Sequence, residues 1–89
     1  MSNNKLTKVQ IEILMLLFNG WQIGRNEGFN PRHWMQSNGI GKGGEMRNVN
    51  VKTFNALLLD GYIQKSKQGY PTSKYDITEK GKKIVKNAS

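Results

Sequence analysis

NVKTFNALLLDGYIQKSKQGYPTSKYDITEKGKKI, residues 50–84, is the stretch that decides the fold. Asn50 is a good helix N-cap, because its side chain can accept a hydrogen bond from a backbone N–H of the first turn. Gly61 predicts the end of this helix, since glycine readily takes the left-handed conformation that closes a helix. Apolar residues recur between the two at helical spacing, and we expect them to face the core: Val51, Phe54, Leu57 and Leu58.

The segment after this helix predicts a β-hairpin and then a last helix. Residues 62–67 and 73–77 alternate in the manner of two strands, and the turn-forming sequence QGYPT separates them. Thr78 predicts the cap of a helix over residues 79–87. This half of the chain is therefore expected to fold as helix, hairpin and helix.

A helix ending in LLLDGYI, a basic hairpin and the sequence YDITEKGKKIV together resemble the second half of a winged helix-turn-helix domain. That is the fold of many small bacterial and phage transcription regulators, and the resemblance is specific for the fold rather than for one regulator. It implies an α+β, mostly helical winged helix with a three-helix core, a β-hairpin wing and a C-terminal helix.

The length and composition of the chain exclude several classes of protein. Its 89 residues suffice for one domain, and the absence of cysteine excludes disulfides, Cys-ligated zinc and thiol nucleophiles. The start MSNNKLTK lacks the apolar run of a signal peptide, and the longest apolar run, Ile13–Phe18, is far shorter than the ~20 residues of a membrane span. We therefore expect a cytoplasmic protein of a bacterial or phage-host cell, without a membrane partner.

The charge of the chain is strongly basic and unevenly distributed. Fourteen Lys and Arg residues against six Asp and Glu residues give a net charge of +8. Residues 1–46 hold five basic and three acidic groups, whereas residues 47–89 hold nine and three. A basic excess centred on one helix and hairpin is typical of a protein that binds phosphates, although small basic domains are also common for reasons of solubility.

Thr7 and Gln10 form a capping-box pattern that predicts a first helix over residues 8–18, ending at Gly20. Residues 1–5 are polar and are expected to be frayed. The helix is apolar around most of its circumference, so it needs more than one partner surface. Its surplus apolar side must meet the C-terminal helix or a second protomer, and it favours a homodimer through these two helices.

Two interpretations fit the segment between the first helix and the glycine-rich loop. The Asn30-Pro31 pair favours a helix over residues 31–38, because proline directly after an N-cap is typical of a first helical position. The alternative pairs residues 21–25 with residues 33–36 as a hairpin. We prefer the helix on the strength of its cap.

Residues 39–48 form a glycine-rich loop in which the chain departs from the winged helix pattern. A helix-turn-helix joins its two helices by three or four residues, whereas about ten intervene here. The loop lacks the Gly-x4-Gly-Lys-Ser/Thr order of a phosphate-binding loop, which disfavours nucleotide binding. We interpret it as a flexible connection, or as an extra element that reaches a phosphate or a partner.

Polar residues on the helix after Asn50 and on the hairpin are the candidates for binding DNA. Lys52 and Asn55 are i, i+3 neighbours that can enter one groove, and asparagine can form two hydrogen bonds to adenine. The hairpin lysines would neutralise phosphates, although lysines on an edge strand also discourage aggregation. The predicted DNA-binding residues are Arg47, Asn48, Asn50, Lys52, Thr53, Asn55, Lys65, Lys67 and Lys74.

Leu59 does not fit a polar helix surface. It lies on the side of Lys52 and Asn55, where an apolar side chain gains nothing from contact with water. We expect the glycine-rich loop or the hairpin to cover it, with a dimer contact as the alternative.

The sequence offers no support for catalysis. His33 is the only histidine and is expected at the surface or at a helix end, and the six acidic residues form no obvious pair for acid–base or metal chemistry. We therefore predict no enzymatic activity, no cofactor and no metal.

The predicted function is sequence-specific binding of double-stranded DNA in transcription regulation, with the helix after Asn50 in the major groove and the hairpin on the backbone. A protein–protein interaction module of a regulatory or mobile-element complex is the alternative, which the apolar first helix also suits. Binding of RNA or single strands needs exposed aromatic side chains for stacking, and only Tyr70 is expected to be exposed.

Overall fold

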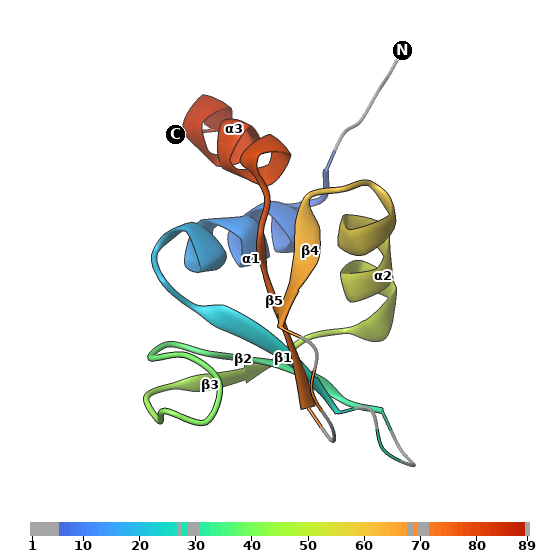
Figure 1. The fold of residues 1–89 in the computed structure, drawn as a ribbon. Helices are drawn as coiled ribbons and strands as arrows, with labels where there is room; N and C mark the ends of the chain where they lie inside the picture. The colour runs from blue at the N-terminus through green and yellow to red at the C-terminus, as the bar shows by residue number, and fades with distance from the viewer. Residues whose placement is uncertain (1–5, 27, 29–30, 68, 70–71, 89) are drawn as a thin grey trace.

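The computed structural model describes residues 6–26, 28, 31–67, 69 and 72–88 of the chain (Figure 1). Within these residues the helices are α1 (Lys8–Phe18), α2 (Val51–Leu59) and α3 (Glu79–Ala88). The strands are β1 (Gln22–Asn26), β2 (His33–Gln36), β3 (Met46–Asn48), β4 (Ile63–Lys67) and β5 (Thr72–Ile77). The frayed N-terminus expected for residues 1–5 lies outside the described residues.

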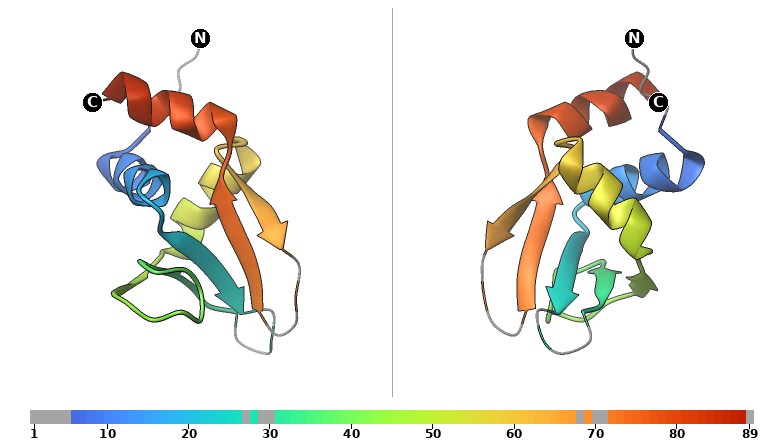
Figure 2. Two further views of the ribbon diagram at one scale, coloured as in Figure 1. Left: turned by 60° about the vertical axis from the view of Figure 1, so that its left-hand side comes forward. Right: turned by 90° about the vertical axis from the view of Figure 1, so that its right-hand side faces the viewer.

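The strands form one antiparallel sheet in the order β3-β2-β1-β5-β4. Helix α2 crosses one side of this sheet, and α1 lies between the sheet and α3 (Figure 2). Ile23, Met35 and Tyr75 are neighbours across three strands and point toward α2. We call this the helix side of the sheet, and the opposite side, which carries Gly24, Trp34 and Lys74, the loop side.

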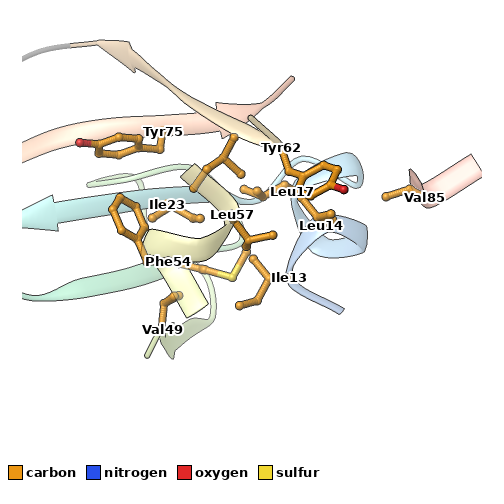
Figure 3. Close-up of a cluster of buried hydrophobic side chains, with 12 residues drawn as sticks. Ile13, Leu14, Leu17, Ile23, Val49, Phe54, Leu57, Tyr62, Tyr75 and Val85 are labelled. Carbon is orange, nitrogen blue, oxygen red and sulfur yellow. The ribbon is translucent and has the colours of Figure 1, made fainter. Parts of the chain in front are cut away.

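The core fills the space between the helix side of the sheet and the three helices (Figure 3). Phe54 and Leu57 enter it from α2, and α1 contributes its inward-facing leucines and isoleucine. Its buried hydrophobic residues are Ile13, Leu14, Leu17, Ile23, Met35, Val49, Phe54, Leu57, Tyr62, Ile63, Tyr75 and Val85.

The first helix forms as its local signals predict. Thr7 Oγ1 accepts from the backbone N–H of Gln10 while the Gln10 side chain accepts from the backbone N–H of Thr7, so the capping box is complete. At the other end Gly20 has a φ of 106°, and the Trp21 N–H donates to the Leu16 carbonyl. This bond and the bond from the Gly20 N–H to the Leu17 carbonyl close the helix in a Schellman motif.

The helix, hairpin and helix predicted for the second half of the chain are also confirmed. The Asn50 side chain accepts from the Lys52 N–H at 2.7 Å, and Gly61 closes α2 with a φ of 80°. Strands β4 and β5 start and end within one residue of the predicted arms. Thr78 Oγ1 accepts from the Gly81 N–H and so caps α3.

The predicted fold class is wrong in its first half, because the three-helix core is absent from the described residues. Residues 31–38 contain strand β2 instead of a helix, and this strand pairs with β1 on one side and β3 on the other. The structure is α+β with a five-stranded antiparallel sheet. The hairpin alternative for residues 21–25 and 33–36 is the correct one.

Long-range pairing explains why the cap at residues 30–31 did not produce a helix. An eight-residue helix is marginal without tertiary support. As a strand, the same segment buries Met35 on the helix side and half-buries Trp34 on the loop side, because successive side chains point to opposite faces. Asn30, the predicted cap, lies outside the described residues.

The glycine-rich loop lies on the loop side of the sheet as an ordered turn between β2 and β3. The Gln22 and Gln36 side chains accept from the backbone N–H groups of Ile40 and Gly41 at 3.0 and 2.9 Å. Ile40 is buried, and it approaches Trp34 over the bare Cα of Gly24. The loop therefore covers the sheet. It does not cover Leu59 of α2, so that expectation was wrong.

The helices of the described residues are too short to cross a lipid bilayer, and none of them is sufficiently apolar over the necessary length.

Candidate nucleic-acid interface

Helix α2 presents a continuous surface to solvent on the side away from the sheet. We call this surface the outer face of α2 and define it by the exposed residues Val51, Lys52, Asn55 and Leu59. Lys52 and Asn55 were predicted to share one surface, and the structure brings them together there.

Aromatic packing beneath α2 fixes which side of the helix faces outward. The Phe54 ring lies 4.3 Å from the His33 ring and 4.9 Å, edge to face, from the Tyr75 ring, centroid to centroid. His33 is buried at 7% exposure under the helix, so its predicted place at the surface is wrong. His33 is buried because it lies in strand β2 two residues before Met35, so its side chain points to the same helix side of the sheet.

Two apolar residues lie on the outer face against our expectation. Val51, predicted to point inward, is 51% exposed, and Leu59, predicted to be covered, is 85% exposed. At about 100° per residue, Leu59 lies roughly 170° from the midpoint between Phe54 and Leu57. With these two residues locked in the core, Leu59 cannot reach any part of the sheet.

Cations surround the N-terminal half of α2 on the helix side of the sheet. The Lys65 ammonium group lies 5.9 Å from the centroid of the Tyr75 ring. Arg25 is opposite both His33 and Ser73 in the sheet and therefore emerges on the same side. Exposed Arg32 borders a shallow cavity of about 430 Å³ at the start of α2, lined by Pro31, Arg32, His33, Asn48, Val49 and Val51.

Arg25 and Arg32 were not among the predicted DNA-binding residues. The helix preferred for residues 31–38 gave no reason to bring either arginine near α2. The hairpin alternative would have drawn attention to Arg25, because it places residue 25 opposite residue 33. In the structure His33 lies under α2, so Arg25 lies near that helix.

Arg47 is turned away from the outer face of α2. Its guanidinium donates to the Glu12 carboxylate of α1 at 2.8 Å. The hydrogen bond from Arg47 and its charge lower the pKa of Glu12, and the same hydrogen bond raises the pKa of Arg47. The structure thus assigns Arg47 to a contact between β3 and α1.

Two other predicted residues are engaged in the helix itself. Asn50 uses its side-chain oxygen as the N-cap of α2. Thr53 is half-buried on the flank of the helix and is not part of its outer face. Asn48, by contrast, is exposed and borders the cavity at the start of α2.

The three hairpin lysines do not share one side of the sheet. Lys65 is opposite Tyr75 and emerges on the helix side, whereas Lys74 is opposite Gly24 and emerges on the loop side. An irregularity in β4 between Lys65 and Lys67 then places Lys67 directly opposite Lys74. The lysine side chains therefore straddle the hairpin, and Tyr70 lies outside the described residues.

Comparison of the chain with protein-family models, with curated proteins and with solved structures finds no match. The candidate interface must therefore be interpreted from its own geometry and chemistry. Among the residues with described positions, no three histidine or acidic side chains gather where they could hold a metal ion.

Proposed function

We propose that this protein binds double-stranded DNA, with the outer face of α2 in the major groove, and that it acts as a sequence-specific transcription regulator. The observation that carries the proposal is the combination on one side of the molecule of Lys52 and Asn55, both exposed on one helix, with cations from neighbouring strands. A groove-reading helix flanked by phosphate-binding cations is the arrangement that duplex recognition needs.

The dimensions and side chains of α2 suit a major groove. Its nine residues give a length of about 13 Å, and the groove, about 12 Å wide, admits one helix. Asn55 carries the amide that can bond adenine at two positions, and Lys52 can reach a guanine edge or a phosphate. No other described element lies over the outer face of α2 (Figure 2, right).

The placement of the acidic residues supports the same surface. Glu12 is neutralised by Arg47, and Asp60 lies at the C-terminal end of α2, away from the cations. Asp76 is opposite Gln64 on the loop side. Among the described acidic residues, none lies between the N-terminal half of α2 and Lys65, so an approaching phosphate backbone meets attraction there.

Lys67 and Lys74 give a second reason to expect an anion near the hairpin. Like charges directly opposite each other in an antiparallel pair destabilise the pair. A phosphate beside the hairpin would screen this repulsion. Relief of the repulsion would then add to the free energy of binding. We assign the backbone contact beside α2 to Lys65 alone, because Lys74 emerges on the loop side, away from α2.

The test is the salt dependence of binding to a labelled mixed-sequence duplex, measured by fluorescence anisotropy. Each phosphate neutralised contributes about −0.9 to the slope of log K against log salt. We expect Lys52→Ala and Lys65→Ala each to weaken binding and to reduce the slope by about one phosphate. Lys83→Ala is the matched control, since Lys83 is exposed on α3, away from the interface.

Three results would overturn the proposal. Affinity that does not change with salt would remove the phosphate contacts on which it rests. Equal losses for Lys83→Ala and Lys52→Ala would mean that net charge acts without a site. Stronger competition by single-stranded than by duplex DNA would favour single-strand binding instead.

The homodimer remains a prediction within this proposal. Helix α3 packs against α1, whose exposed surface still carries Val9, Met15 and Phe18 at between 40% and 47% exposure. A second copy packed on this surface would set two α2 helices at a fixed spacing, as a palindromic DNA site requires. Light scattering coupled to gel filtration measures the mass and decides between monomer and dimer.

A further inference from the structure

The outer face of α2 contains one row of side chains, inclined to the helix axis. Val51, Asn55 and Leu59 follow one another at intervals of four residues, so they lie above each other along the helix. The row therefore consists of an amide between two aliphatic groups. Both aliphatic groups are at least half exposed, and Leu59 at 85% is the most exposed large hydrophobic side chain of the described residues.

Isolated exposed apolar residues are common and need no explanation, but this row has an ordered chemistry. The major groove offers one apolar group, the C5-methyl of thymine, and an acceptor–donor pair on adenine that asparagine matches. Each member of the row therefore has a partner in an A·T base pair. A guanine or cytosine edge offers no methyl group to either aliphatic side chain.

We propose, on the basis of the proposed function, that this row gives the protein a preference for consecutive A·T base pairs. Asn55 bonds N6 and N7 of an adenine, and Val51 and Leu59 each contact a thymine methyl on either side of it. Lys52 lies beside the row and serves the DNA backbone at its edge.

The spacing of the row sets the expected length of the site. Val51 and Leu59 are eight residues apart, which is about 12 Å along the helix axis. Base pairs follow each other at about 3.4 Å, so the row covers roughly three to four steps. We therefore expect an A·T core of about four or five base pairs, with the adenine read by Asn55 near its centre.

The experiment replaces thymine by uracil, which removes the C5-methyl and leaves base pairing intact. Duplexes bound by the wild-type protein are first selected from a random pool, and we expect an A·T-rich core in them. Thymines of the core are then replaced singly by uracil. Burial of one methyl group is worth about 0.8 kcal/mol, so each contacted thymine should cost about fourfold in affinity when replaced.

Variants of the row identify which side chain reads which base. Leu59→Gln keeps the length of the side chain and removes its apolar character, so one uracil position should lose its effect while the salt slope stays unchanged. Val51→Ser, which removes both methyl groups of the side chain, should do the same at the other position. Asn55→Ala should abolish the preference for the central adenine, and Lys83→Ala should leave all preferences as in the wild type.

The outcomes separate this inference from the function on which it rests. Salt-dependent duplex binding with no A·T core and no uracil effect overturns the A·T preference and leaves DNA binding intact. No binding of any duplex overturns both. A change of oligomeric state in Leu59→Gln, with an unchanged response to uracil, overturns the inference by assigning the row to a protein contact. Circular dichroism confirms that each variant is folded, which the exposure of these residues leads us to expect.

Discussion

The guanidinium of Arg47 donates to the carboxylate of Glu12 over 2.8 Å and so connects the short strand β3 to helix α1. β3 has three residues and pairs only with β2 among the described strands. This ion pair therefore joins the edge of the sheet to the helical part of the molecule. It also neutralises Glu12, the one acidic residue of α1.

The Glu12–Arg47 pair makes a contribution to stability that depends on pH. Because the pKa of Glu12 is lowered in the folded chain, the pair stabilises the protein above the ordinary glutamate pKa of about 4.3. The contribution disappears as the pH falls through the lowered, folded-state pKa. We expect the wild type to be more stable than Glu12→Gln at pH 7, and the two to converge at low pH.

Urea unfolding of both proteins at several pH values measures this difference. All other carboxylates are common to the two proteins, so subtraction of their unfolding free energies isolates the pair. A difference that stays constant from pH 7 down to pH 2 would contradict the assignment.

Gly81→Ala should destabilise the protein although alanine is the better helix former. A Cβ at position 81 would lie 2.5 Å from the Tyr62 carbonyl oxygen and 2.7 Å from Ile77 Cγ1. Overpacking of this kind costs about 1–3 kcal/mol of stability, whereas the higher helix propensity of alanine gains about 1 kcal/mol. The loss exceeds the gain if the backbone of α3 cannot move away from Tyr62. Urea unfolding measures the sign, and Lys83→Ala in the same helix is the neutral control. A gain in stability would mean that α3 can shift away from Tyr62.

Gly24→Ala should disturb the packing of the glycine-rich loop. A Cβ there would lie 2.9 Å from both Ile40 Cδ1 and Trp34 Cζ2. We expect a loss of about 1–3 kcal/mol from overpacking. Ile40→Ala removes one of the two obstacles, so the double variant should be more stable than the sum of the single effects predicts. Strict additivity in thermal unfolding would contradict contact between the loop and this side of the sheet.

The two sides of α2 should respond oppositely to truncation. Phe54 is 1% exposed and packs against two rings, so Phe54→Ala should cost about 3–5 kcal/mol, a large part of the stability of a small domain. Leu59→Ala should change stability by no more than about 0.5 kcal/mol. Chemical unfolding of both variants measures this contrast. A large loss for Leu59→Ala would mean that α2 is rotated or that a second chain covers it.

Signals confined to a few neighbouring residues predicted their elements well. The capping box at Thr7, the cap at Asn50 and the stop at Gly61 each act through hydrogen bonds within one helical turn, and each is present in the structure. The hairpin was also predictable because alternation and turn residues both lie within one short segment. Such interactions depend on nearby sequence and can be recognised without knowledge of the rest of the chain.

The segment that was wrongly predicted carried two conflicting local signals. The Asn-Pro pair favours a helix, whereas the possible hairpin with residues 21–25 favours a strand at residues 33–36. The strand is formed because β1 and β3 supply hydrogen-bonding partners on both of its edges. Those partners lie about ten residues away in either direction, and no property of the segment itself indicates which signal prevails.

The candidate interface shows the same division. The shared exposed surface of Lys52 and Asn55 was predicted correctly, because both lie on a helix with a clear buried side. The sequence did not predict that Lys65 lies on one side of the sheet and Lys74 on the other. That arrangement depends on the register of β5 with both of its neighbours and on an irregularity in β4 between Lys65 and Lys67. Since a shift of one residue moves a side chain to the other face of a sheet, alternation alone could not assign these lysines.

The amino-acid sequence by itself determined the basic charge, the ends of its helices, the hairpin and the amphipathic character of α2, because each depends on composition or on contacts within one element. Only the tertiary structure decided that residues 33–36 are a strand, that the glycine-rich loop covers the sheet, and that Arg25, Arg32 and Lys65 emerge beside α2. The strand and the positions of the cations result from pairing between strands, and the place of the loop results from hydrogen bonds to the Gln22 and Gln36 side chains. These interactions join segments that are separated in the chain, so no single segment specifies them.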